Sequence, residues 1–262
     1  MTNTERETDY GVPLPGEWVA EEARTSTHVQ RLPLGYLTSQ AIFQRAAPFV
    51  VDLGCGNGRA SILHALAHPE MDHLAVDIFP GAIRHASRRA NRRGLNNIRF
   101  AVGDAREIIR RLPDGSVAEV HLYHPQPIYD MAAASKRLLT PAFLLQVHRV
   151  LLPTSRPAEA GTPTFILQTD HPAYWQYLET VVPLFFTWEP STEPWPDAPE
   201  GRTRREILAR QMGLPIFRAI AHPRVDLNGE DAKRIAEKMP LPRFDADRTL
   251  QQLDARENEL GE

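Results

Sequence analysis

Short apolar runs alternate with stretches of helical periodicity through the middle of the chain. Runs rich in β-branched and other apolar residues, bounded by Gly, Pro or Asp, are typical of strands buried on both faces: 48–54, 73–79, 97–104, 117–123 and 164–170. Each is followed by a segment with apolar positions at helical spacing: 59–68, 80–94, 105–112, 140–152 and 172–182. This alternation predicts an α/β fold with a doubly wound, Rossmann-like, mostly parallel sheet.

The pattern weakens at both ends of the chain. Residues 1–45 are rich in Pro, Gly, Glu and Thr and predict a partly irregular lead-in. Residues 46–227 contain all the predicted strands and form the expected principal domain. Residues 228–262 form a charged extension, in which helices are possible but no pattern predicts a contribution to the core.

Composition narrows the class of protein. The chain has 262 residues, of which 42% are apolar, enough for a sizeable core. Its single cysteine, Cys55, excludes a disulfide framework and a cysteine-built zinc site, and favours a reducing compartment. The N-terminus lacks the pattern of a signal peptide, and no apolar run is long enough to span a bilayer. We therefore expect a cytoplasmic protein.

Charge is distributed unevenly around a net charge of −3. Residues 81–137 contain eleven Lys or Arg residues against five acidic ones. A locally basic segment can bind phosphates, and a solvated helix face is an equal alternative. Arginines recur at helical spacing in two series, Arg84, Arg88 and Arg92, and the adjacent Arg89 and Arg93.

The most specific local motif follows the first predicted strand. In VVDLGCGNGRA, glycines at 54, 56 and 58 allow a sharp bend and a close approach of the backbone to a ligand. Arg59 stands where the dinucleotide fingerprint requires its third glycine, so the motif does not match an NAD enzyme. The spacing of Gly54, Gly56 and Gly58, with Asp52 before them, instead resembles the first motif of S-adenosylmethionine (SAM) methyltransferases.

Two further acids support a cofactor site. Asp77 ends the second predicted strand and Asp104 ends the third. The carboxyl ends of parallel strands line one crevice, where an acid can accept hydrogen bonds from ribose hydroxyls. Both acids could alternatively cap helices. Together with the glycine loop, they predict SAM as the cofactor.

Beyond these motifs, the chain resembles the bacterial tRNA (guanine-N(7))-methyltransferases from about Phe49 to about Leu227. The segments LGCGNGRA, GLNNIRF, GDA, LPDGSV, KRLLTPAFL, QTDHPAYW and TRRE come in the family's order. LPDGSV and KRLLTPAFL are more specific than the glycine loop. The resemblance implies methyl transfer from SAM to tRNA, with SAM held by Asp52, Asp77 and Asp104.

The resemblance also implies residues that contact the substrate. Asp170, in QTDHPAYW, would contact the target guanosine. Thr203 and Glu206 match the Thr and Glu of the family's T-x-F-E motif, in which Arg205 here replaces the Phe. The tRNA phosphates are expected to contact the basic segment 84–111.

The chain departs from the family at HPQP, where the family reads roughly F-P-D-P-W-P followed by a dense basic run. Counting back from KRLLTPAFL aligns the family's Asp with Gln126 and its Trp with Ile128. The basic run aligns with YDMAAAS, which leaves Lys136 and Arg137 as further tRNA contacts. Gln126 thus occupies the catalytic position. We hypothesise attenuated activity or an altered substrate, because an amide can orient a base but supplies no negative charge.

Other functions stay open. A SAM-dependent methyltransferase of a small molecule or protein, and a non-catalytic SAM-binding protein, are both compatible with loss of the basic run. We expect no metal site, because His64 and His68 lie four apart on a predicted helix without an evident third ligand. His121 and His124 lie three apart on a strand and therefore on opposite faces. The oligomeric state is not predicted.

Overall fold

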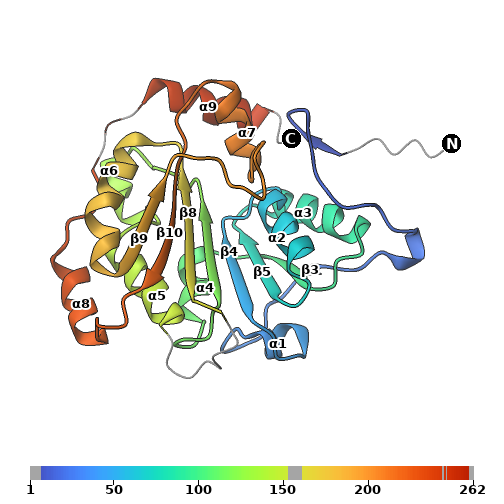
Figure 1. Cartoon of the computed structure of the whole chain (residues 1–262), viewed down its shortest axis with the longest axis horizontal. Coiled ribbons are helices and arrows are strands. Elements are labelled where there is room, and N and C mark those ends of the chain that lie inside the picture. Colours follow the sequence, from blue (N-terminus) through green and yellow to red (C-terminus); the bar gives the residue numbers. More distant parts are fainter. Residues whose placement is uncertain (1–6, 153–160, 244, 246, 260–262) are drawn as a thin grey trace.

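The computed structural model describes residues 7–152, 161–243, 245 and 247–259. Its centre is an eight-stranded sheet in the order β3-β6-β5-β4-β7-β8-β10-β9 (Figure 1). Neighbours from β3 to β8 pair in parallel, whereas β10 runs antiparallel to β8 and β9. The predicted doubly wound, mostly parallel α/β fold is confirmed. The strands are β3 (His28–Val29), β4 (Phe49–Leu53), β5 (Asp72–Asp77), β6 (Ile98–Val102), β7 (Glu119–Tyr123), β8 (Thr164–Thr169), β9 (Phe186–Ser191) and β10 (Phe217–Pro223).

Helices cover both faces of the sheet. The described α-helices are α1 (Ser39–Phe43), α2 (Arg59–Ala67), α3 (Pro80–Arg92), α4 (Ala105–Arg110), α5 (Pro141–Leu151), α6 (Pro172–Val181), α7 (Arg204–Gln211), α8 (Gly229–Lys238) and α9 (Arg248–Glu259). Among these described segments, none combines the length and apolar character that a membrane-spanning helix requires.

Successive strand residues face opposite layers of the protein. Leu74 of β5 belongs to the same core cluster as Ile108 of α4 and Leu144 of α5, whereas its neighbour Ala75 belongs to the cluster that contains Ile83 of α3. All five residues of β4 are buried, as expected for a parallel strand covered on both sides. The sheet therefore has α4, α5 and α6 on one face and α2 and α3 on the other.

The sheet continues beyond the predicted alternation. Strand β10 lies between β8 and β9, and β9 forms the edge. The sequence pattern predicted no strand after residue 170, and β9 contains Pro190. An edge strand tolerates Pro190 because one side of the strand needs no ladder hydrogen bond.

The C-terminal segment also contributes to the core. Ala232 of α8 is fully buried in the main cluster, which also contains α5 residues. Leu250 and Leu253 of α9 are 3% and 0% exposed and pack with Leu208 of α7. No sequence pattern in residues 228–262 had indicated this contribution to the core. Each helix buries only a narrow stripe, and the charged majority of the segment conceals that stripe in the sequence.

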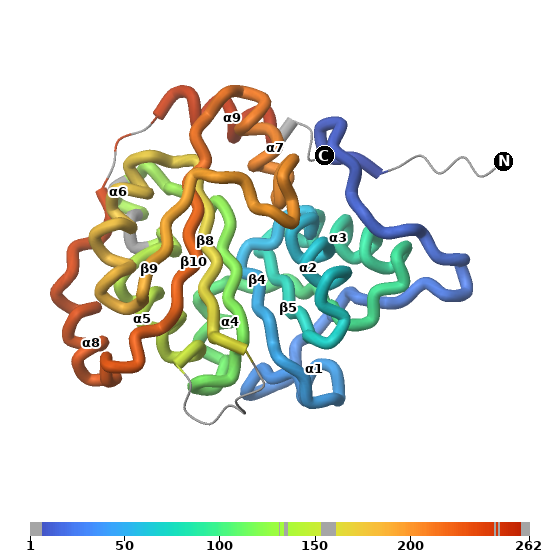
Figure 2. Tube along the Cα trace, viewed as in Figure 1, coloured from blue at the N-terminus to red at the C-terminus, as the bar shows by residue number. Residues whose placement is uncertain are grey.

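The N-terminal lead-in folds back along α3 (Figure 2). It begins with a hairpin of β1 (Thr8–Asp9) and β2 (Val12–Pro13). Asp9 forms ion pairs with Arg59 (3.1 Å) and Arg89 (2.8 Å). Because Asp9 is 6% exposed, these pairs fix the hairpin beside the glycine loop.

Candidate active site

The loop between β4 and α2 has a backbone that favours glycine. Gly54, Gly56 and Gly58 have φ angles of +86°, +52° and +77°. A Cβ atom on Gly54 or Gly56 would meet no heavy atom within 4 Å, whereas one on Gly58 would lie 2.6 Å from Cβ of Ala86. The first two glycines therefore leave open space beside the loop, and the third allows α2 to pack against α3.

Asp77 ties this loop to the end of β5. Its carboxylate accepts hydrogen bonds from the backbone N–H groups of Gly56 (2.9 Å) and Phe79 (2.9 Å). The large apolar side chains that follow, Ile78 and Phe79, are 59% and 64% exposed, and Val102 at the end of β6 is 45% exposed. Exposed apolar side chains beside a fixed carboxylate suit a ligand with one apolar and one hydroxylated part.

Asp104 begins α4 as its N-cap. Its carboxylate accepts hydrogen bonds from the backbone N–H (2.7 Å) and the guanidinium (2.7 Å) of Arg106. Hydrogen bonds from this arginine side chain hold the pKa of Asp104 below its ordinary value. The capping role considered in the sequence analysis is therefore present. The side chain nevertheless remains 36% exposed, so it can also contact a ligand.

Asp52 lies beneath the loop and is 3% exposed. One carboxylate oxygen accepts a hydrogen bond from the Ser61 hydroxyl, and the other has no partner among the described residues. Burial raises the pKa of Asp52 to about 7. An acceptor left unpaired at the base of an open glycine loop fits a ligand that brings a donor of its own.

These features fit SAM. The partly exposed carboxylates can accept hydrogen bonds from ribose hydroxyls, and the exposed apolar side chains can pack against adenine. We call this set the donor half of the site: Gly54, Gly56, Asp77, Ile78, Val102 and Asp104. The residues predicted to contact the methyl acceptor lie at the ends of β7 and β8 and at the start of α7, and we call them the acceptor half.

In the acceptor half, the HPQP segment leaves the sheet as a stiff turn. His124 has a φ of +48°, an uncommon value for a residue with a side chain. Pro125 and Pro127 are buried, and the Nε of Arg137 donates to the Pro127 carbonyl (2.8 Å). Gln126 between the prolines is exposed. The turn therefore presents the Gln126 amide to solvent on a constrained backbone.

A chain of hydrogen bonds fixes the His124 ring. The indole N–H of Trp195 donates to Gln168 Oε1, and Gln168 Nε2 lies 2.9 Å from His124 Nε2. Because an amide nitrogen only donates, His124 Nε2 accepts and Nδ1 carries the proton. That Nδ1 lies 3.1 Å from one oxygen of Asp170, whose other oxygen accepts from Arg205 Nε (2.9 Å).

Asp170 is thereby held inside the protein as a carboxylate. It is 3% exposed, and although burial opposes ionisation, His124 and Arg205 hold its pKa well below the ordinary value. Arg205 also binds Asp254 (2.6 Å) and Glu257 (3.0 Å) of α9. The carboxylate predicted to contact the guanosine is therefore part of an internal ion cluster that joins β8, α7 and α9.

Glu206 is fully buried at the start of α7. One of its oxygens pairs with Arg218 of β10, and the other accepts from the backbone N–H of Arg202 (2.8 Å). Thr203 is the N-cap of α7, since its hydroxyl accepts from the Glu206 N–H (2.9 Å). Both residues thus have structural roles in this conformation, and their predicted contact with substrate stays a prediction.

The sequence matches known methyltransferases. A family model described as "Putative methyltransferase" matches residues 46–219. A tRNA (guanine-N(7)-)-methyltransferase of Nitrosococcus oceani is 30% identical over 187 residues, which cover 71% of this chain and 76% of that relative. This chain belongs to the tRNA (guanine-N(7)-)-methyltransferase family.

Other relatives match over shorter spans. The protein of the same name from Halorhodospira halophila is 36% identical over 45% of this chain, which spans about half (52%) of that relative. The solved structure of the 16S rRNA methyltransferase KamB is a distant likeness, with 15% identity, a TM-score of 0.48, and coverage of 69% of this chain and 90% of that one. Family membership makes this chain a SAM-dependent methyltransferase.

Burial corrects part of the predicted tRNA-binding surface of this methyltransferase. Arg89 and Arg93, with 1% and 6% exposure, bind the N-terminal acids Asp9 and Glu7. Arg137 is 1% exposed and donates to backbone carbonyls in the HPQP turn. These three arginines cannot reach phosphates in this conformation, because their guanidinium groups are inside the protein. The exposed basic residues of the predicted set are Arg84, Arg88, Arg110 and Lys136.

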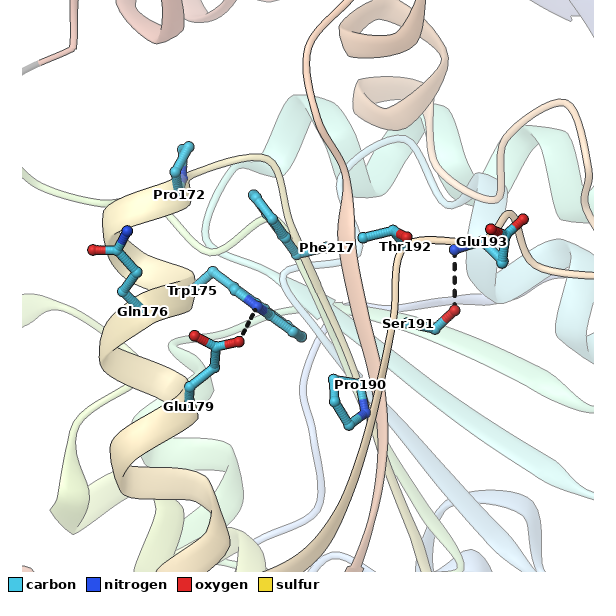
Figure 3. A pocket seen from close by; sticks show the side chains of 9 residues that line it. All are labelled: Pro172, Trp175, Gln176, Glu179, Pro190, Ser191, Thr192, Glu193 and Phe217. Carbon is cyan, nitrogen blue, oxygen red and sulfur yellow. Dashed lines mark hydrogen bonds between the residues drawn. The ribbon is translucent and has the colours of Figure 1, made fainter.

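A surface hollow of about 620 Å³ lies between α6 and the β9–β10 edge (Figure 3). Trp175 stacks on Phe217 with ring centroids 5.3 Å apart, and its indole N–H donates to Glu179 (3.0 Å). The lining includes Glu179 and Glu193 and no basic side chain, so it does not suit a nucleic acid. Trp175 is 6% exposed and is a packing residue of the main core cluster.

No motif in the sequence indicated the ion cluster around Asp170. Arg205 differed from the family pattern, and no partner for it was predicted. An arginine at an apolar family position requires buried acidic partners, and Asp254 and Glu257 lie three residues apart in a segment where a helix was possible. These two features could have indicated that Arg205 pairs with these acids, although not where in the fold the pairing occurs.

Proposed function

We propose that this methyltransferase methylates N7 of a guanosine in tRNA, at a rate reduced by Gln126. The main support is the position of Gln126, exposed on a constrained turn at the end of β7. Strand β7 pairs in parallel with β4, so the turn and the glycine loop extend from neighbouring strand ends. The names of the relatives support tRNA as the substrate.

In this proposal the donor half binds SAM, which supplies the electrophilic methyl group. Asp77 accepts hydrogen bonds from the ribose hydroxyls, and Asp104 contacts the adenine edge. Ile78 and Val102 pack against the adenine ring. Asp52 would accept a hydrogen bond from a donor of SAM through its unpaired oxygen, since its other oxygen is bound to Ser61.

The acceptor half orients the guanine. N7 carries an in-plane lone pair, so no proton has to leave it before attack, and alignment provides much of the rate. The Gln126 amide can hydrogen-bond the base on a turn that the two prolines stiffen. It cannot stabilise the positive charge that develops on the methylated base. Loss of one such electrostatic stabiliser typically costs on the order of 10²–10³ in rate.

Nearby carboxylates replace this charge only in part. Asp130 accepts from the Ala132 N–H (2.9 Å), which ties it to the start of the following 3-10 segment. Asp170 is ionised but shares its charge with His124 and Arg205. These contacts favour a slow enzyme over one in which another acid has taken over the family's catalytic role.

The exposed basic residues would contact the tRNA backbone. Arg84 and Arg88 lie four residues apart on the outer face of α3, and Lys136 follows the HPQP turn. Each phosphate contact adds affinity that decreases with salt. With the family's basic run absent, these few contacts support weak tRNA binding.

The test is incubation of the full chain with methyl-labelled SAM and unmodified tRNA transcript, followed by nucleoside analysis. We expect labelled 7-methylguanosine, and none from a transcript made with 7-deazaguanosine, which lacks the N7 nucleophile. SAM binding is measured separately by calorimetry. SAM binding without 7-methylguanosine at high enzyme concentration would overturn the tRNA proposal and favour a different acceptor or a non-catalytic role.

A further inference from the structure

Histidines from three elements gather between α2 and the sheet, away from the SAM site. His73 and Glu119 lie at the amino-terminal ends of β5 and β7 and His121 lies midway along β7, whereas Asp77 and Gln126 lie at or beyond the carboxyl ends. Glu119 and His121 are two residues apart on β7 and therefore face the same layer. The cluster consists of His64 of α2, His68 directly after α2, His73 of β5, and Glu119 and His121 of β7.

Three donor atoms in this cluster converge. Glu119 Oε2 lies 2.8 Å from His121 Nε2 and 3.3 Å from His64 Nε2. Ligand atoms of His64, Glu119 and His121 all lie within 4.8 Å of one another. Ligands of a tetrahedral zinc ion are about 3.4 Å apart, given bonds of about 2.0–2.2 Å. Small side-chain rotations would bring these atoms to that spacing.

The hydrogen bonds that involve His64 and His73 determine which ring nitrogen of His64 carries no proton. His73 Nδ1 lies 3.2 Å from the Asn97 carbonyl, which can only accept, so His73 carries its proton on Nδ1. His73 Nε2 therefore accepts from His64 Nδ1 at 2.8 Å. Neutral His64 then directs the lone pair of Nε2 towards the Glu119 carboxylate. Two facing lone pairs repel each other unless a cation lies between them.

The environment of His121 and the edge of the cluster are also compatible with a bound cation. His121 Nε2 lies 2.8 Å from the Glu119 carboxylate, which can only accept, so this nitrogen carries a proton that a bound metal ion would displace. His121 Nδ1 has no hydrogen-bond partner among the described residues. His64 and Glu119 are 12% and 20% exposed, which leaves a route from solvent. The His68 ring lies 4.3 Å from the His64 ring, near enough to act as a fourth ligand or to border a bound water.

We propose that His64, Glu119 and His121 form a binding site for a divalent transition-metal ion of the zinc class. Imidazole and carboxylate together are a common ligand set for such ions. The ion would link α2 to β7 and stabilise the fold below the glycine loop. His73 would be a positioning residue, since it holds the His64 ring through Nδ1. The site is independent of the proposed methyl acceptor.

The experiment uses untagged full-length protein stripped with a chelator and titrated with Zn²⁺ by calorimetry. Co²⁺ replaces Zn²⁺ in a parallel titration, because its visible absorption reports the coordination number. We expect one equivalent of either ion to bind, and Zn²⁺ to raise the melting temperature. If the stripped protein bound neither Zn²⁺ nor Co²⁺, the proposal would be overturned.

Variants assign the ligands. His64→Gln and Glu119→Gln should each weaken Zn²⁺ binding by more than about 100-fold, and His73→Phe by about 10- to 100-fold. His28→Gln, on an exposed residue of β3, is the matched control and should bind as the unmutated chain does. Circular dichroism checks that each variant folds. Unchanged affinity in both ligand variants would overturn the assignment even if the chain bound zinc.

Discussion

At the ends of β5 and β6, Asp77 and Asp104 keep part of their surface exposed, whereas Asp170 and Glu206 in the acceptor half are 3% and 0% exposed. The first pair is fixed largely by backbone N–H groups and a neighbour two residues away. The second pair is bound by arginines from other elements. Carboxylates near the strand ends thus serve different purposes, depending on whether a buried arginine from a distant part of the chain is folded against them.

The difference has a physical origin. A backbone N–H stabilises a carboxylate and leaves its outer face free for a ligand. A buried arginine instead requires an acid that remains paired, because an unpaired charge inside the protein is strongly destabilising. An acid in the acceptor half can reach the substrate only if its ion pair breaks. Five predictions test this comparison, from the largest expected effect to the smallest.

Glu206→Ala should lower the free energy of unfolding by about 3–5 kcal/mol, because Arg218 would be left as an unpaired buried charge. Denaturant titration followed by circular dichroism measures the change. Glu193→Ala, on an exposed residue, is the control and should change stability little. A loss below about 1 kcal/mol would show that Glu206 is not structural, and would favour its predicted role in binding substrate.

Gln126→Asp should raise the rate of methyl transfer to tRNA by on the order of 10²–10³, since it restores a negative charge beside the methylated base. Initial rates at saturating SAM measure the gain. Gln126→Asn is the control, because it keeps the amide and adds no charge. Equal rates for the aspartate variant and the unmutated enzyme would mean that charge at this position does not limit catalysis.

Asp77→Asn should weaken SAM binding by on the order of 10–100-fold, because hydrogen bonds to a charged group contribute about 1.5–3 kcal/mol. Calorimetry with SAM gives the dissociation constant. The control is Asp231→Asn in the first turn of α8, which should bind SAM normally. If Asp77→Asn also bound SAM normally, the donor half would have been assigned to the wrong residues.

The apoprotein should lose stability as pH rises from about 4 to about 7. Burial raises the pKa of Asp52 to about 7 from an unfolded value of about 3.9, so the folded state retains a proton that the unfolded state releases. The loss is at most about 1.4 kcal/mol per pH unit from this group. Asp52→Asn should remove this component of the slope. Stability–pH curves of equal slope for the unmutated protein and the Asp52→Asn variant would contradict this prediction.

Arg84→Ala and Arg88→Ala should each weaken tRNA binding and reduce the salt dependence of the binding constant by about one ion equivalent. Filter binding at several salt concentrations measures the slope. Arg234→Ala, on an exposed arginine of α8, is the control. An unchanged slope in both α3 variants would remove this helix from the tRNA-binding surface.

Features that depend on contiguous residues could be predicted from the sequence, whereas contacts between distant residues could not. The parallel strands and the glycine loop were predictable because each depends on contiguous residues, such as Phe49–Leu53 and the glycines that follow. Asp104 was predictable as a cap for the same reason. The pairing of Asp170 with Arg205 joins residues 35 positions apart, and the pairing of Arg205 with Asp254 spans 49. No periodicity signals contacts of that range.

The sequence by itself determined the doubly wound core, the glycine loop and the family, because backbone geometry and strand burial are set by local residue order. Tertiary structure alone decided which charged side chains remain exposed. Arg89 and Arg137 look like phosphate ligands in the sequence, yet both are 1% exposed. A charge enters the interior only where the fold supplies partners, and those partners come from distant parts of the chain.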